Sequence, residues 1–165
     1  MSLFTIREVE KGDRDWIRRW LVFQWGAEIV ISHDTVYHPA DLLGFIAIDP
    51  VNSEPIGLIT YVFSGNECEI VTLDSLREGN GIGSALIDHV ILHARNIACD
   101  RVFLVVTNDN IYSLGFYQKR GFRLVKINSG AADRARKQKP QIPAVGYFSI
   151  PIHDEIELEY RLNPQ

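Results

Sequence analysis

Residues 77–87 read REGNGIGSALI and set three glycines, Gly79, Gly81 and Gly83, within five positions. An apolar run with helical spacing follows at once. Glycines gather in this way where the backbone needs a positive φ or must come close to another group. The unpaired N–H groups at a helix start, together with the helix dipole, form an anion site. The stretch therefore predicts a turn into a helix that could bind a phosphate, with a tight turn lacking any ligand as the alternative.

Two common phosphate-binding motifs do not fit this stretch. A P-loop needs Lys and then Ser or Thr after its last glycine, but Ser84 and Ala85 follow Gly83. A dinucleotide fingerprint needs a glycine where Ser84 stands and an acidic residue at the end of the next strand, but that strand ends at Thr107. An unrelated nucleotide-binding protein is therefore the less favoured interpretation.

The hydrophobic pattern on either side of the glycines alternates between strands and helices. It predicts strands at residues 4–9, 28–32, 44–49, 56–64, 67–74, 101–107, 122–127 and 155–162, and helices at 13–26, 81–100, 110–120 and 132–140. Residues 33–43 read as loop, Asp13 as a helix N-cap, and residues 132–140 as a solvated basic face. The three strands over 44–74 should form an antiparallel meander, and strand 101–107 should be buried on both faces. Residues 1–165 are thus expected to form one mixed α/β domain.

Composition narrows the class of partner. The formal net charge of −4 argues against nucleic acid, and no apolar run is long enough to span a membrane. The N-terminal residues lack the pattern of a signal peptide, and Cys68 and Cys99 read as buried thiols, so a cytoplasmic location is expected. His89 and His93 lie one helical turn apart, but no third ligand is near, and no metal site is predicted.

A second stretch, TNDNIYSLGFYQKRGF at residues 107–122, adds to the first. Asn110 and Tyr117 are seven residues apart, which places them on one face of a helix. With these two motifs at this spacing, most of the chain resembles the GNAT family of N-acetyltransferases. The resemblance implies an α/β (α+β mixed) fold with a central mixed sheet flanked by helices. It also implies acetyl-CoA as donor and coenzyme A as product.

The same resemblance implies a set of cofactor-binding residues. The pyrophosphate would be held by backbone N–H groups of Gly79, Asn80, Gly81, Ile82, Gly83 and Ser84, and the pantetheine by the strand edge at Val71, Thr72 and Leu73. Asn110 would bind the pantetheine arm, and Tyr117 would lie near the sulfur. The family usually has Arg or Gln where Glu78 stands, so backbone contacts should carry this binding, with Arg77 as a substitute charge.

Acetyl transfer to an amine needs a base, donors for the oxyanion and an acid for the leaving thiolate. Tyr117 is the candidate acid, with a purely packing role as the alternative. Glu67 and Glu69 are the candidate bases, predicted to share a strand face with Val71 and Leu73. The alternative for both glutamates is a solvated position beside a turn.

Residues that could contact the acceptor fall in two regions. Glu28, His33 and Asp34 lie where the family builds its acceptor wall, and His153 and Glu155 approach from the other end. The acceptor itself, a small-molecule or peptide amine, is not identified, although the acidic stretch HDEIELEY (153–160) favours a cation. A homodimer through the last strands is possible. The alternative function is a non-catalytic acyl-CoA-binding or sensing domain of the same fold.

Overall fold

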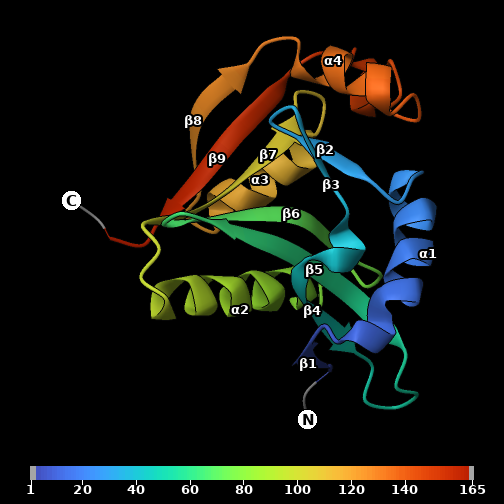
Figure 1. Cartoon of the computed structure of the whole chain (residues 1–165), viewed down its shortest axis with the longest axis vertical. Coiled ribbons are helices and arrows are strands. Elements are labelled where there is room, and N and C mark those ends of the chain that lie inside the picture. Colours follow the sequence, from blue (N-terminus) through green and yellow to red (C-terminus); the bar gives the residue numbers. More distant parts are fainter. Residues whose placement is uncertain (1–2, 164–165) are drawn as a thin grey trace.

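The computed structural model describes residues 3–163, in which helices pack on both faces of a mixed sheet (Figure 1). The strands are β1 (Thr5–Glu8), β2 (Val30–Ser32), β3 (Thr35–Tyr37), β4 (Leu43–Ile48), β5 (Pro55–Ser64), β6 (Glu67–Ser75), β7 (Arg101–Thr107), β8 (Arg123–Asn128) and β9 (Glu155–Arg161). The helices are α1 (Arg14–Trp25), α2 (Ile82–Asn96), α3 (Ile111–Lys119) and α4 (Ala131–Gln138), and short 3-10 turns lie at η1 (Lys11–Asp13), η2 (Pro39–Asp41) and η3 (Tyr147–Ser149).

Seven strands form the main sheet in the order β1-β4-β5-β6-β7-β9-β8. All neighbouring strands are antiparallel except β6 and β7, which are parallel. The larger core packs α2 and the buried face of α3 against one side of the sheet, and a smaller core packs α1 against the other side. This arrangement confirms the mixed α/β fold and the antiparallel meander β4-β5-β6.

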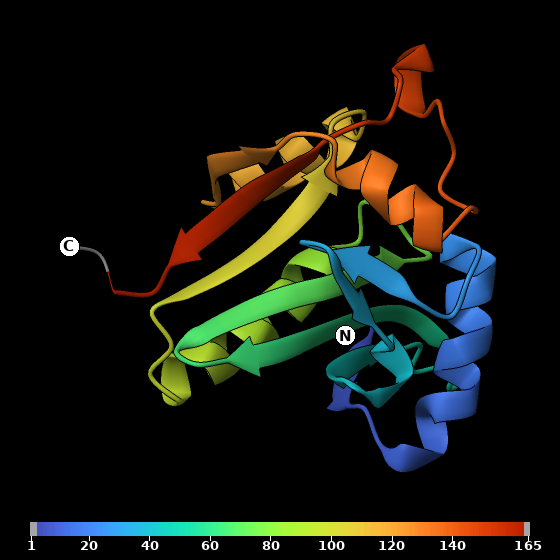
Figure 2. The same cartoon turned by 45° about the horizontal axis from the view of Figure 1, so that its top comes forward.

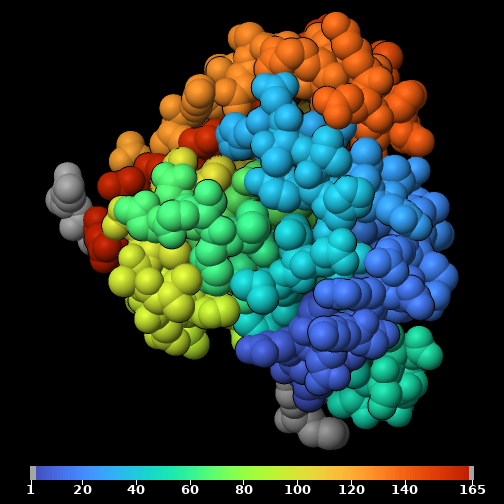
Figure 3. Space-filling view, in the orientation of Figure 1, coloured from blue at the N-terminus to red at the C-terminus, as the bar shows by residue number. Residues whose placement is uncertain are grey.

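The segment between β2 and β4 was predicted to be loop, and this is wrong in part. Here β3 pairs with β2 in a separate two-stranded hairpin. His33 and Asp34 occupy its turn with φ of 50° and 60°. Two central residues with positive φ are typical of the tight turns that suit a hairpin, but glycine or asparagine usually marks them. The hairpin crosses the sheet between α1 and α4, and its surface meets the orange part of the chain that contains α4 (Figures 2 and 3).

Two further predictions need correction. Strand β7 is not buried on both faces, because Val102, Leu104 and Val106 are buried while the residues between them are half-exposed. On its second face, Phe103 packs edge-on against the His33 ring of the hairpin, and Val105 and Thr107 border a cavity. Asp13 precedes α1 but does not cap it, because its carboxylate binds Arg7 at 2.8 Å and the backbone N–H of Glu10 at 2.8 Å instead.

Strand β6 contains one extra residue relative to β5. Thr72 is paired with Thr60 and Ile70 with Tyr61, so Val71 is a β-bulge. Before the bulge, Glu69 faces the hairpin and Ile70 faces the α2 core; after it, Leu73 faces that core. The predicted shared face of Glu67, Glu69 and Leu73 is therefore wrong.

The bulge lies where β6 and β7 separate. The two strands are paired only over Glu67–Glu69 and Arg101–Phe103. Beyond these residues the edge of β6 that faces β7 has no partner strand, and a cavity opens between the two strands.

Replacing Leu158 by Ala is expected to lower the free energy of unfolding by about 2–5 kcal/mol, because the residue is 0% exposed in the larger core and would leave a cavity. Leu124 is its register partner on β8 and is 48% exposed. The matched Leu124→Ala change should cost about 1 kcal/mol or less. Urea denaturation of both variants compares them, and equal losses would show that β9 is not part of the core.

Candidate functional site

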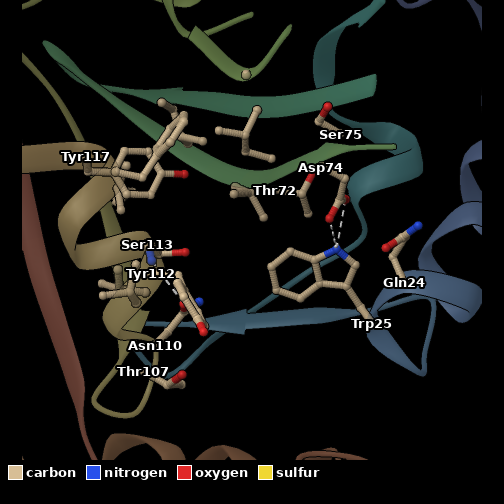
Figure 4. Close-up of a pocket in the computed structure, with 18 of the residues that line it drawn as sticks. Gln24, Trp25, Thr72, Asp74, Ser75, Thr107, Asn110, Tyr112, Ser113 and Tyr117 are labelled. Carbon is tan, nitrogen blue, oxygen red and sulfur yellow. Dashed lines mark hydrogen bonds between the residues drawn. The ribbon is translucent and has the colours of Figure 1, made fainter. Parts of the chain in front are cut away.

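One cavity of about 1190 Å³ occupies the opening between β6 and β7 (Figure 4). Its walls come from the separated halves of both strands, from the glycine-rich turn, from α3, from the end of α1 and from β2. The residues that line the cavity include Trp25, Ser32, Val71, Thr72, Leu73, Asp74, Arg77, Gly79, Gly81, Ile82, Gly83, Ser84, Thr107, Asn110, Tyr112, Tyr117, Arg120, Tyr147 and Glu155. The cavity thus brings together the two motifs that the sequence pointed to.

The glycine-rich turn opens directly into α2. Gly79 and Gly81 have φ of 78° and 77°, and Gly81 is the N-cap of α2, which no side chain caps. A Cβ at either position would meet no atom within 4 Å, so this side of the turn is open. A Cβ on Gly83 would lie 3.1 Å from the Phe116 ring, so this glycine allows α2 and α3 to pack closely. The geometry is that of an accessible helix N-terminus with free N–H groups.

Arg120 supplies a positive charge beside this turn. Its Nε donates to Ser84 Oγ at 2.6 Å, and its guanidinium lies 3.4 Å from the centre of the Phe116 ring. Arg77 also borders the cavity but forms an ion pair with Asp49, while the Glu78 side chain is exposed. Sequence reasoning missed Arg120, because Arg120 and Ser84 are 36 residues apart in the chain.

Asn110 and Tyr117 both border the cavity from α3. The Asn110 side chain accepts a hydrogen bond from the Ser113 backbone N–H at 3.1 Å and so caps the helix. Tyr117 is 7% exposed, and its ring packs edge-on against Phe116 and Phe122. Burial raises the pKa of the Tyr117 phenol above its usual range, so the phenol is protonated near neutral pH.

The two candidate bases from the sequence lie elsewhere. Glu69 is 6% exposed and accepts hydrogen bonds from Ser32 at 2.5 Å and from Tyr37 at 2.8 Å. Burial opposes its ionisation, but His33, Ser32 and Tyr37 outweigh burial and lower the pKa of Glu69. Glu67 binds Arg101 at 2.9 Å. Neither residue borders the cavity, so the structure does not bring either carboxylate to the place where an amine would react.

Most of the predicted acceptor contacts are also outside the cavity. Glu28 is exposed, Asp34 binds Arg134 of α4 at 2.9 Å, and His153 binds Asp133 at 2.9 Å. The ring of His33 contacts Glu157 at 2.7 Å. These contacts fasten the β2–β3 hairpin and the start of β9, so the residues shape the wall without lining it.

Two more deeply buried carboxylates border the cavity, in addition to the exposed Glu78 of the glycine-rich turn. Glu155 at the start of β9 is 4% exposed and accepts the His33 backbone N–H at 3.2 Å. Asp74 on β6 accepts the indole N–H groups of Trp20 at 3.2 Å and Trp25 at 2.9 Å. Burial raises the pKa of Glu155 and of Asp74 above their usual ranges, although the N–H donors act in the opposite direction. Sequence reasoning named Glu155 only as a contact and missed Asp74.

A strap at residues 144–152 closes another side of the site. Asp109 is 3% exposed and accepts hydrogen bonds from Thr107 Oγ1 at 2.6 Å and from the Tyr147 backbone N–H at 3.0 Å. A Cβ on Gly146 would overlap the Asp109 carboxylate, so only glycine allows this approach. The strap thereby sets Tyr147 at the cavity beside Tyr112, with ring centres 5.5 Å apart.

His33 is expected to make the stability of the hairpin depend on pH. Glu69, and then Glu157, raise the pKa of His33 above its usual value. Its ion pairs therefore contribute fully below the unfolded pKa of about 6.5 and are lost as pH rises through the higher folded value. The wild-type free energy of unfolding, relative to that of His33→Gln, should fall as pH rises above about 6.5, until His33 is neutral in the folded protein. Denaturation series at several pH values test this, and a constant difference would contradict it.

Within residues 3–163, no helix has the length and hydropathy of a membrane span. In the same residues, no group of three or more His, Cys, Asp or Glu side chains is arranged to hold a metal ion.

Comparison with known proteins adds independent findings. The sequence pattern of the acetyltransferase (GNAT) family matches residues 6–122. The uncharacterized protein YdhI of Bacillus subtilis (strain 168) is 40% identical over 132 residues, which cover 80% of this chain and 82% of that protein. Among solved structures, an IAA acetyltransferase from Bacillus cereus superposes with a TM-score of 0.74 at 19% identity, covering 96% of this chain and 99% of that one. An Elizabethkingia anophelis acetyltransferase with acetyl-CoA bound gives 0.71 at 20% identity, covering 98% and 99%.

Proposed function

Because the chain belongs to the acetyltransferase (GNAT) family, we propose that it transfers an acetyl group from acetyl-CoA to a primary amine of a small molecule or peptide. One observation carries the proposal. A single cavity joins an uncapped helix N-terminus, an unpaired strand edge, a buried phenol and a buried carboxylate. These are the groups needed to bind a long anionic thioester and to move two protons.

The donor fits the part of the cavity on the α2 side. N–H groups from Gly79 to Ser84 would hold the pyrophosphate, and Arg120 would add a charge-assisted contact. The free edge of β6 at Val71, Thr72 and Leu73 would pair with the pantetheine amides in the manner of an added strand. Asn110 and Tyr117 would flank the arm and the sulfur. The acetyl-CoA bound to the Elizabethkingia anophelis relative supports this choice of donor.

The chemical step is a direct attack. Glu155 would accept a proton from the ammonium of the acceptor, and the neutral amine would form a C–N bond to the thioester carbonyl. The backbone N–H near Leu73 would stabilise the tetrahedral oxyanion. As the C–S bond breaks, Tyr117 would give a proton to the thiolate. The attacking nitrogen would lose its second proton through water to the Tyr117 phenolate, which leaves a neutral amide and restores the phenol. Glu155 replaces Glu67 and Glu69 in this scheme, because it borders the cavity and its raised pKa suits a base.

Calorimetry with acetyl-CoA tests the donor, and release of free thiol in the presence of an amine panel tests the transfer. We expect binding that is lost with an analogue lacking the pyrophosphate and thiol release that depends on an amine. Binding without thiol release from any amine would instead identify a sensing domain. Absence of binding would leave the glycine-rich turn as a purely structural feature.

Replacing Tyr117 by Phe is expected to lower kcat by about tenfold, because the thiolate loses its proton donor. The loss is limited, since a thiol with a reference pKa of about 8.5 is a good leaving group, and it should shrink above that pH. Steady-state rates across pH measure this effect. Wild-type rates throughout would assign Tyr117 to packing alone.

A further inference from the structure

The charges around the cavity are divided between the two faces of the sheet. Arg120 lies with Ser84 on the side of α2 and α3. Asp74 lies on the side of α1, where Trp20 and Trp25 bind it, and Glu155 lies under the β2–β3 hairpin. An anion is therefore favoured on the first side and a cation on the second.

Neither of the two carboxylates is within salt-bridge distance of a cation. This holds for Asp74 and Glu155 among residues 3–163, although both are at least partly buried and border the cavity. The charge of His33 acts on Glu155 from farther away and lowers its pKa, but burial raises that pKa by more. The hydrogen bonds of the two carboxylates come from two indoles and one backbone N–H, which are neutral donors. A carboxylate removed from water in this way is stabilised strongly by a ligand that brings a positive charge.

The two carboxylates also lie on opposite sides of the cavity. Figure 4 shows Asp74 and Trp25 facing Thr107 and Asn110 across the open space. Thr107 is the register partner of Glu155 on the neighbouring strand, which places Glu155 on the Thr107 side. The indole of Trp25 lies between the two sides (Figure 4), and the ammonium of the buried Lys139 lies 5.9 Å from the centre of its ring.

We propose that the acceptor is a small molecule with two amino groups joined by an apolar spacer. The reacting amine lies beside Glu155, and the second ammonium is held by Asp74 next to the Trp25 ring. This inference rests on the proposed function. When Glu155 takes the proton of the reacting ammonium, the distal ammonium keeps its charge and its pairing with Asp74, so the substrate stays anchored through the step. The Trp25 ring covers the apolar spacer.

The walls on the acceptor side favour a small molecule over a polypeptide. The hairpin is fastened to β6 through Ser32 and Glu69, to β9 through His33 and Glu157, and to α4 through Asp34 and Arg134. The strap is fastened through Asp109. Both segments are therefore held in place around the acceptor side, and a linear diamine needs only the space between Trp25 and Thr107.

The inference is tested with a panel of linear α,ω-diamines of increasing length. Each diamine is compared with the n-alkylamine of equal length and with a short peptide that has a free N-terminus. Thiol release from acetyl-CoA is the readout. For the best diamine we expect a kcat/KM about tenfold or more above that of its matched monoamine. Equal values, or a preference for the peptide, would overturn the inference while leaving acetyl transfer to amines intact. If no amine is acetylated, the proposed function fails and this inference with it.

Variants assign the anchoring to Asp74. Asp74→Asn should raise KM for the diamine about tenfold relative to KM for the monoamine, and thus remove the preference. Asp74→Glu should restore part of it, which distinguishes lost charge from lost structure. Asp15→Asn, on the exposed face of α1 with its carboxylate 82% exposed, is the control and should keep the wild-type preference. A preference that survives Asp74→Asn with unchanged KM would overturn the assignment.

Discussion

Glu155→Gln is expected to reduce kcat by at least about 100-fold, which is the usual contribution of a positioned general base. Glutamine keeps the shape of the side chain and can still accept the His33 backbone N–H, so the wall of the cavity should remain intact. What is lost is the ability to take a proton from the acceptor ammonium. Steady-state kinetics with a saturating amine measure the loss.

The pH dependence separates this role from a structural one. Burial raises the pKa of Glu155, and a base must be ionised, so wild-type kcat/KM should fall as pH drops through that raised value. Glu155→Gln should lack this acidic limb. Glu67→Gln is the matched comparison, because Glu67 is bound to Arg101 outside the cavity. A large loss in Glu67→Gln with none in Glu155→Gln would return the base to the residue that strand alternation suggested.

Gly81→Glu is expected to weaken acetyl-CoA binding by about 100-fold, as measured by calorimetry. The substitution places a carboxylate at the N-terminus of α2, where the pyrophosphate would lie, and like charges repel strongly. A side chain at Gly81 meets no neighbouring atom, so the effect is electrostatic together with the cost of a φ of 77°.

Gly65→Glu isolates the backbone cost. Gly65, in the turn between β5 and β6, has a φ of 59° and also has nothing within 4 Å of an added Cβ. It lies outside the cavity. The two variants should lose similar stability, but only Gly81→Glu should lose affinity. Unchanged affinity in Gly81→Glu would remove the glycine-rich turn from the donor site.

The sequence predicted the order of the strands and helices well, because those depend on local periodicity. The meander around Gly65 and the helix after Gly81 each have a strong local signal of turn residues and apolar spacing. The hairpin at His33 and Asp34 has no such signal, since its strands are three residues long and its turn lacks glycine.

The donor side of the site was easier to predict than the acceptor side for a related reason. Its residues lie in two continuous stretches of the chain. The acceptor side depends on contacts between distant segments, such as Trp25 with Asp74 and His33 with Glu155. Glu67 is held outside the cavity by an ion pair with Arg101, and Glu69 by hydrogen bonds from Ser32 and Tyr37. These partners are distant in the sequence, so no local pattern could predict the contacts.

The bulge at Val71 has a consequence for how this strand can change over time. On β6, odd-numbered side chains such as Glu69 face the hairpin before the bulge, and even-numbered ones such as Asp74 face that side after it. Deleting Val71 would restore simple alternation and leave Leu73 and Asp74 on their present sides. The variant would lose the bulge at the point where β6 and β7 separate, so this one-residue deletion is expected to alter the cavity while leaving both cores in place.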